Sequence, residues 1–288
     1  MNKYYENLMN LDEAKGLKEL IGKWENLSAN MEKYPANAPI ILPDLFVTAK
    51  SASMVSRLVE NLSGYLAFRS NIMDFYGDVR YFEFMLNYCC PEEDFNEIRR
   101  LMDEVITSAG FRSIYKGIVH IRIDAWLGHQ EEQHFINFLD YLAENTGDWL
   151  IILSVSSGED EKVMAMESVV SMFLRIQRIE LNMPSTETYV AELEAMIGKY
   201  HFRLSEGAAA LLAASVDVLK ENRYFDSLYT MRLLCSDIVY EMYSGKPRSS
   251  MVLTEDDLKD FSSGSPYIRR TIKKMTDSRK IGFIKDLR

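Results

Sequence analysis

The chain has 288 residues, of which 47% are hydrophobic and 26% are charged, with 7 prolines and 14 glycines. This composition predicts a compact, helix-rich protein, and the length favours one large domain plus a smaller one. The formal net charge of −10 argues against non-specific binding to nucleic acid, because contacts to phosphates need clustered lysines and arginines.

Basic residues gather at the C-terminal end of the sequence. Residues 263–288 hold eight lysines and arginines and two aspartates, which leaves 25 basic and 41 acidic residues on the rest of the chain. Such a tail is either solvated or docked on its own protein, or it binds an acidic partner or an anionic surface. We favour the solvated or self-docking tail.

The three cysteines do not make a disulfide framework, and no charged-then-apolar leader opens the chain. We therefore expect a protein of the reducing cytoplasm. No apolar run approaches the ~20 residues that a bilayer span needs, so no membrane span is expected.

Helix and strand patterns alternate through the first two thirds of the chain. Apolar residues recur at helical spacing over residues 17–27, and prolines then separate this helix from a short apolar strand at 45–47. A second helix is expected over residues 54–68. Residues 82–88 have the pattern of another strand.

Pro91 suits the first turn of the next helix, and Gly110 suits its end. A clear buried-strand pattern follows at residues 117–123, and Asp124 comes directly after it. The apolar residues between 135 and 142 then indicate a helix that ends before Gly147.

Two more apolar runs, at residues 149–153 and 176–181, have the composition of strands. The continuous run at 149–153 is typical of a parallel strand that is covered on both faces. Strands that alternate with helices predict an α/β fold with a parallel, doubly wound sheet.

Residues 185–262 have helical patterns and offer no strand candidate. Ser205 is positioned to start one helix, residues 227–243 form another, and Thr254 begins a string with the composition of a helix cap. We therefore predict an α/β domain over residues 1–183, a helical subdomain over 184–262 and a basic tail over 263–288.

The order of these elements and several short strings resemble the AAA+ ATPases, most closely the bacterial branch with the sporulation-type and rubisco-activase-type members. Residues 11–21, which contain Gly16-Leu17 before a helix, are similar to the opening motif of that branch. The resemblance covers residues 10–261 in outline. It implies a P-loop-NTPase-like parallel sheet sandwiched by helices and followed by a small all-helical lid.

The phosphate loop of that family is not retained. Glycines in such a loop let backbone N–H groups converge on the anion, and a lysine reaches the outer phosphates. Residues 45–59 contain no glycine. The resemblance places Ala52 at the lysine position and Ser53 at the magnesium-binding hydroxyl, and Lys50 is the nearest alternative cation.

At the second motif, Asp124 matches the aspartate that helps to hold magnesium, whereas Ala125 stands where the family keeps a glutamate that polarises water. The ordinary alternative for Asp124 is a strand-end carboxylate that caps a nearby loop or helix. We favour this alternative.

The arginines of the family are displaced as well. Met172 stands at the position of the arginine finger, with Arg175 and Arg178 as candidate substitutes. Tyr229 stands at the position of the lid arginine, with Arg232 as its candidate substitute. Phosphoryl transfer depends on positioning and electrostatic stabilisation of the phosphates, so the joint loss of these groups predicts a poor hydrolase.

We therefore expect a catalytically inactive pseudo-ATPase that acts as a structural, regulatory or adaptor subunit, without a cofactor. Its partners would be proteins, either an active AAA+ relative or a second copy of itself. One alternative is a protein that holds ATP or ADP with magnesium at Lys50, Ser53 and Asp124 without turnover. Another is a working ATPase with a remodelled phosphate loop.

Two further clusters contain residue types that can bind metals or act as nucleophiles. Five residues on a regular helix place His129 and His134 about 140° apart, so we expect no metal site there. Cys89 and Cys90 would point to opposite faces of a strand, and we expect them to be buried as small hydrophobic residues.

Overall fold

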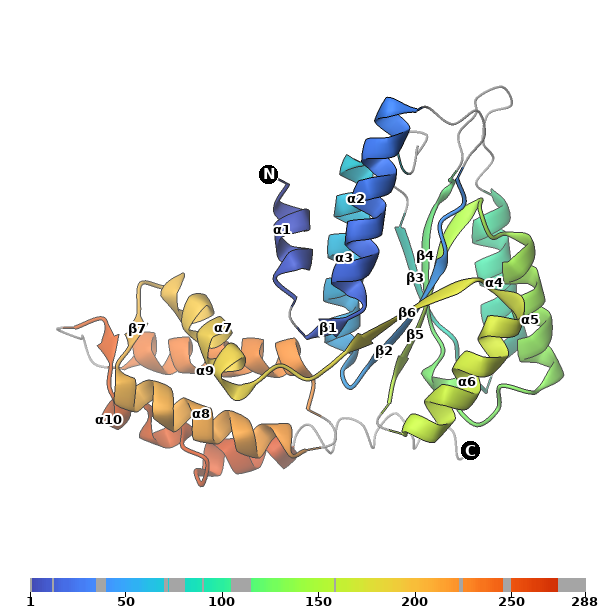
Figure 1. The fold of residues 1–288 in the computed structure, drawn as a ribbon. Coiled ribbons are helices and arrows are strands. Elements are labelled where there is room, and N and C mark those ends of the chain that lie inside the picture. Colours follow the sequence, from blue (N-terminus) through green and yellow to red (C-terminus); the bar gives the residue numbers. More distant parts are fainter. Residues whose placement is uncertain are drawn as a thin grey trace. The chain divides into compact units, whose positions relative to one another are not determined.

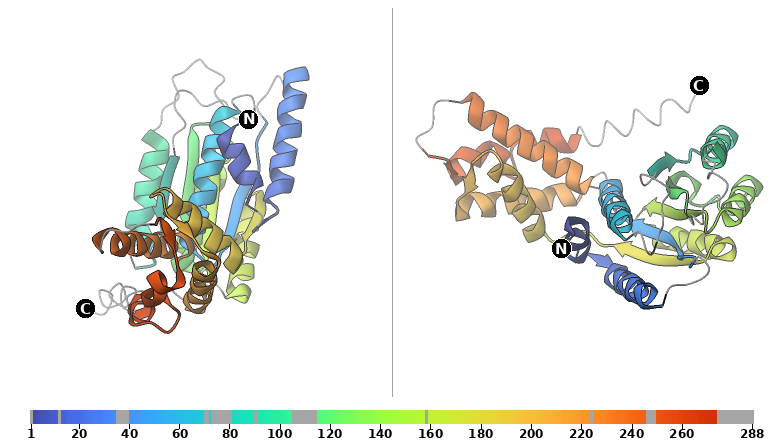
Figure 2. Two further views of the ribbon diagram at one scale, coloured as in Figure 1. Left: turned by 90° about the vertical axis from the view of Figure 1, so that its left-hand side faces the viewer. Right: turned by 90° about the horizontal axis from the view of Figure 1, so that it is seen from above.

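The computed structural model describes residues 2–11, 13–34, 40–69, 72, 81–89, 91–104, 115–157, 159–222, 225–245 and 250–273. The chain divides into two compact units, Met1–Asn182 and Met183–Arg288. The first is an α/β unit and the second is mainly helical, as Figures 1 and 2 show. Within the described ranges, no helix has the length and apolar character needed to cross a bilayer.

A six-stranded sheet forms the centre of the first unit, with the order β1-β6-β2-β5-β4-β3. The strands are β1 (Ala14–Lys15), β2 (Asp44–Ala49), β3 (Tyr81–Met85), β4 (Gly117–Arg122), β5 (Trp149–Ser156) and β6 (Ile176–Leu181). Neighbouring strands pair in parallel except β1, which is antiparallel to β6. The predicted parallel sheet is therefore confirmed, and the carboxyl ends of its parallel strands share one edge.

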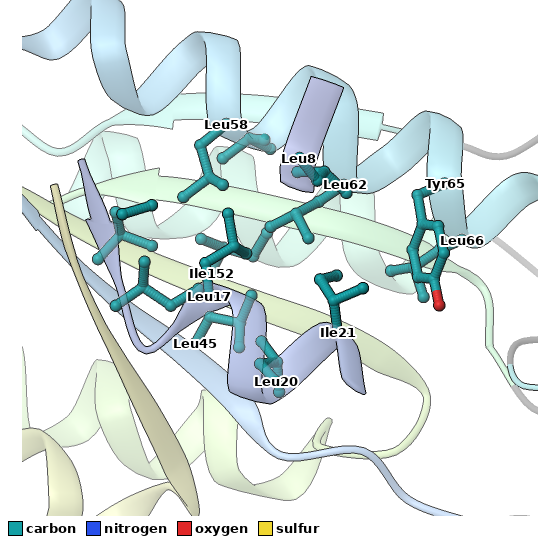
Figure 3. Close-up of a cluster of buried hydrophobic side chains, with 14 of the residues drawn as sticks. Leu8, Leu17, Leu20, Ile21, Leu45, Leu58, Leu62, Tyr65, Leu66 and Ile152 are labelled. Carbon is teal, nitrogen blue, oxygen red and sulfur yellow. The ribbon is translucent and has the colours of Figure 1, made fainter. Parts of the chain in front are cut away.

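Helices cover both faces of this sheet (Figure 1). The helices on one face are α1 (Lys3–Met9), α2 (Leu17–Lys33) and α3 (Ala52–Phe68). Those on the other face are α4 (Pro91–Glu104), α5 (Gln133–Glu144) and α6 (Asp160–Phe173). Figure 3 shows how Leu8, Leu17 and Leu62 from the first three helices pack over Leu45 and Ile152 of the sheet.

The central strands are apolar at successive positions because both of their faces are buried. In β5, Leu150 and Ile152 belong to the core under α2 and α3, whereas Ile151 and Leu153 belong to the core under α4, α5 and α6. Successive side chains of a strand point to opposite faces, so a strand with two covered faces needs no polar position. The prediction made from residues 149–153 is confirmed.

Several boundaries differ from the sequence prediction. β3 ends at Met85 rather than at residue 88, and α1 and β1 were not expected. The seven residues of α1 and the two of β1 are too short to show a clear period. Gly110, the expected end of α4, lies outside the described residues.

The second unit contains α7 (Thr186–Gly198), α8 (Glu206–Lys220), α9 (Ser227–Ser244) and the short α10 (Glu255–Leu258). Ser205 caps α8 as predicted, because its side chain accepts a hydrogen bond from the Ala208 N–H at 3.2 Å. The expectation that residues 185–262 hold no strand is wrong. β7 (Arg203–Leu204) and β8 (Val252–Leu253) form a short parallel pair, and two residues are too few to reveal alternation.

Candidate functional site

Only Lys50 and Ser51 connect β2 to α3. Ser51 has extended backbone angles (φ −142°, ψ 132°), and its side chain makes no cap hydrogen bond to the helix. Its Oγ lies 3.1 Å from the Oγ of Ser53. A two-residue connection without glycine does not form the loop of converging N–H groups that cradles phosphates.

The residues predicted at the phosphate site lie at or next to this connection. Ala52 and Ser53 are half-buried in the first turn of α3, and Lys50 is exposed at the end of β2. Ala52, which stands where a phosphate-binding lysine was expected, is thus the first residue of α3, and its side chain is a methyl group.

Asp124 opens a short 3₁₀ helix, η1 (Asp124–Trp126), directly after β4. Its Oδ1 accepts a hydrogen bond from the backbone N–H of Ser156 at 2.6 Å, and its Oδ2 lies 3.6 Å from Nε of Arg122. The carboxylate therefore links the ends of β4 and β5 and has a cation beside it. These contacts are the ones expected of a strand-end carboxylate that caps a neighbouring segment.

The sheet brings the predicted residues to one edge but keeps the ends of β2 and β4 apart. β5 lies between these two strands, and Ala49 of β2 pairs with Ser156 of β5. Ser156 in turn donates its N–H to Asp124. Along the carboxyl ends of these strands, Lys50 and Ser53 therefore lie on the β2 side of Ser156, and Asp124 lies on its β4 side.

The candidate arginines do not lie together with Lys50, Ser53 and Asp124 at the carboxyl ends of β2 and β4. Arg175 precedes β6 at the opposite edge of the sheet, where its Nη2 donates to the Ile41 carbonyl at 3.4 Å. Arg178 lies within β6, and its Nη1 donates to Oε2 of Glu167 in α6 at 2.7 Å. Arg232 lies on the exposed side of α9 in the second unit.

The two residues at the family's finger and lid positions are both exposed. Met172, near the end of α6, has 79% of its surface accessible, and Tyr229 in α9 has 59%. Neither side chain can supply the positive charge that an arginine brings to a phosphate. Both are available for contacts with another molecule.

A cavity of about 240 Å³ adjoins the end of β2, on the face of the sheet that α6 covers. Its walls come from β2, β6, the segment before α6 and the first turns of that helix. The lining residues are Thr48, Ala49, Lys50, Ser157, Asp160, Val163, Met164, Arg178, Glu180, Leu181 and Asn182. Two predicted residues, Lys50 and Arg178, thus share a cavity that neither Ser53 nor Asp124 lines.

Thr48 was not among the predicted binding residues, although a signal was present. Leu45 and Val47 face the core under α2 and α3, so alternation places Phe46 and Thr48 on the opposite face. A hydroxyl at a position that the pattern makes buried was the available signal. Asp160, which also lines the cavity, gave no such signal.

The histidine and cysteine clusters differ from expectation in their local structure. His129 lies in the turn before α5 rather than in a helix, so the angle of about 140° expected between His129 and His134 on a regular helix does not apply. Its ring stacks on Tyr88 with centroids 4.1 Å apart, and its Nδ1 lies 2.8 Å from Oε1 of Glu132. Among the residues that the structure describes, no group of three or more His, Cys, Asp or Glu side chains could hold a metal.

The expected burial of Cys89 is wrong, because β3 ends before it and leaves the side chain exposed. Cys90 lies outside the described residues.

Comparison with known proteins identifies the fold. No protein-family model and no curated protein matches the chain. A single-residue variant of the Thermotoga maritima RuvB Holliday junction branch migration motor matches with 9% identity and a TM-score of 0.51, over 91% of this chain and 76% of that chain. Domain III of the Thermotoga maritima replication initiation protein DnaA matches with 17% identity and a TM-score of 0.42, over 82% of this chain and 90% of that chain.

The chain therefore has the AAA+ fold of the P-loop NTPases, with a mostly parallel sheet, helices on both faces and a helical C-terminal region. The fold predicted from the sequence is confirmed. At these identities, the likeness to solved structures shows the fold alone.

Proposed function

We propose that this chain is an AAA+-type protein that does not hydrolyse nucleotide and that acts as a structural, regulatory or adaptor subunit of a protein assembly. The observation that carries the proposal is the connection between β2 and α3, which consists of Lys50 and Ser51 alone. It has neither the length nor the glycines of a phosphate cradle.

The residues around the connection do not fit a magnesium nucleotide. Asp124 accepts the Ser156 N–H through Oδ1, and the Arg122 guanidinium lies 3.6 Å from its Oδ2, which has no hydrogen-bond partner among the described residues. Ala125 follows it and has no group that could polarise water. Lys50 lines a cavity in which the carboxylates of Asp160 and Glu180 balance Lys50 and Arg178, so the lining lacks the excess of positive charge that a triphosphate needs.

An exposed row of side chains on α9 supports the proposed role in protein assembly. Tyr229, Leu233, Tyr240 and Tyr243 are all exposed. Their spacings of four, seven and three residues place them on one side of the helix. Exposed apolar surface of this kind is typical of protein contact sites, and tyrosine is enriched in them.

A thermal-shift titration tests nucleotide binding at this site. We expect millimolar ATP or ADP with magnesium to leave the melting temperature unchanged, because the connection between β2 and α3 forms no phosphate cradle. A nucleotide present at ~100 times its dissociation constant would stabilise the protein by about 2.7 kcal/mol. A shift that disappears in Lys50→Met would favour the alternative of a protein that holds nucleotide without turnover.

A further inference from the structure

The cavity beside Lys50 contains unpaired charges of both signs. Lys50 at the end of β2 and Asp160 in the first turn of α6 both line it. Within the described part of the chain, neither of these side chains makes an ion pair or a hydrogen bond. Arg178 differs, because its guanidinium lies 2.7 Å from Glu167 and 3.8 Å from Glu180.

Thr48 lines the same cavity, and its hydroxyl oxygen is buried. The residue is 7% exposed, and its Oγ1 has no hydrogen-bond partner among the described residues. A buried polar group without a partner lowers stability, so native proteins rarely keep one without a reason. In the conformation described, the Oγ1 atom is inaccessible from the cavity; rotation about χ1 would turn the hydroxyl toward the cavity, where a ligand could supply the missing partner, since a hydroxyl can both donate and accept.

The cavity lies on the opposite face of the sheet from α3. Thr48 pairs with Glu180 across β2 and β6, so the two side chains point to the same face. Val163 and Met164 of α6 form the apolar part of the lining. The site therefore combines a polar floor at the ends of two strands with an apolar wall from one helix.

The charges and the size of the cavity define the class of ligand. Two basic residues, Lys50 and Arg178, balance two acidic ones, Asp160 and Glu180, so neither a polyanion nor a polycation matches the lining. A volume of about 240 Å³ lies just below the ~300–1,000 Å³ of pockets that hold drug-sized ligands, so the cavity suits a smaller molecule.

From this arrangement we infer that the cavity binds a small zwitterion of the free amino-acid type. Lys50 would contact the carboxylate of the ligand, Asp160 its ammonium group and Thr48 either of the two through its hydroxyl. The apolar wall, with Met164, would take a short side chain. This inference goes beyond the proposed function and does not depend on the absence of hydrolysis.

Methyl NMR of the intact protein tests the inference. Met164 lines the cavity, and its labelled methyl signal can be assigned by comparison with Met164→Leu. We expect at least one common amino acid at millimolar concentration to shift this signal. The matched carboxylic acid without the ammonium group, and the matched amine without the carboxylate, are each expected to bind at least about tenfold more weakly.

The Thr48→Val variant tests whether the Thr48 hydroxyl binds the ligand or stabilises the free protein. Valine has nearly the same shape, so the variant is expected to raise the melting temperature of the free protein and to weaken ligand binding by about tenfold. A lower melting temperature with unchanged binding would overturn the role given to Thr48.

Charge variants keep the inference testable if Thr48→Val does not fold. Lys50→Met and Asp160→Asn change exposed side chains and are each expected to weaken binding about tenfold. Lys162→Met is the matched control, because Lys162 pairs with Glu159 at 2.6 Å and does not line the cavity.

The inference is overturned if no amino acid shifts the Met164 signal, or if the half-analogues bind as tightly as the zwitterion. Nucleotide in the same titration separates the two proposals. A shift with ATP contradicts the proposed function, whereas a negative result with amino acids contradicts only the cavity inference.

Discussion

The Asp44→Asn variant is expected to be more stable than the wild type at pH 7, by up to about 3 kcal/mol. Asp44 is buried at the start of β2, and burial raises the pKa of its carboxyl from 3.8 to about 6. Hydrogen bonds from the Ile151 N–H and the Thr146 hydroxyl, both 3.0 Å long, only partly offset this effect. The ionised carboxylate therefore costs stability at neutral pH.

The sign of the effect follows from the raised pKa. The folded protein binds the proton of Asp44 more tightly than the unfolded chain does, so this group adds stability as the pH falls from about 6 towards 3.8. Asparagine is uncharged and keeps an acceptor oxygen for the Ile151 N–H. The variant should therefore hold its advantage at pH 7 and lose it in acid.

Urea denaturation between pH 7 and pH 4 measures this difference. Asp140→Asn, on the exposed side of α5, is the matched control and should stay close to the wild type. If Asp44→Asn were less stable than the wild type at pH 7, the account of a strained buried carboxylate would be wrong.

The second large effect concerns His120, whose replacement should remove a loss of stability in acid. The side chain is fully buried in β4, with Nε2 2.8 Å from the Ser154 Oγ and Nδ1 3.6 Å from Oε1 of Glu83. Burial lowers the pKa of its imidazole to about 4, although Glu83 opposes the shift. The folded protein therefore holds this histidine in its neutral form.

A lowered histidine pKa gives the opposite pH dependence from Asp44. The neutral imidazole contributes its full stability above pH 6.5, and this contribution is lost as the pH falls from 6.5 to about 4. The loss amounts to about 3 kcal/mol. In His120→Gln it should be absent, because the amide does not titrate.

The pair of variants gives a stringent test, because the two groups oppose each other over the same pH range. His120→Gln should gain stability on acidification through Asp44, whereas Asp44→Asn should lose it more steeply than the wild type. His134→Gln, which changes an exposed residue of α5, should follow the wild-type curve. Identical pH profiles for His120→Gln and the wild type would contradict the assignment.

The fold was largely predictable because its signals are local. A strand buried on both faces must be apolar throughout, as at residues 149–153, and proline at position 91 suits a first helical turn. The elements that were missed, β1, β7 and β8, have two residues each and cannot display a period.

The candidate site was predictable only in part, because local sequence patterns do not predict the order of strands in a sheet. Sequence reasoning placed Lys50 and Asp124 at strand ends, and the structure puts both at the same edge of the sheet. The cavity depends on β6 lying beside β2, which also brings Arg178 into the same lining as Lys50. No residue spacing in the sequence indicates that β2 and β6 are neighbours in the sheet.

Steady-state phosphate release from magnesium ATP tests the central claim most directly. The wild type and Asp124→Asn should be purified in parallel, so that a contaminating ATPase contributes equally to both. The account predicts release at the background rate from both proteins, because no phosphate cradle precedes α3 and Ala125 follows Asp124. Release above background by the wild type that falls in Asp124→Asn would contradict it.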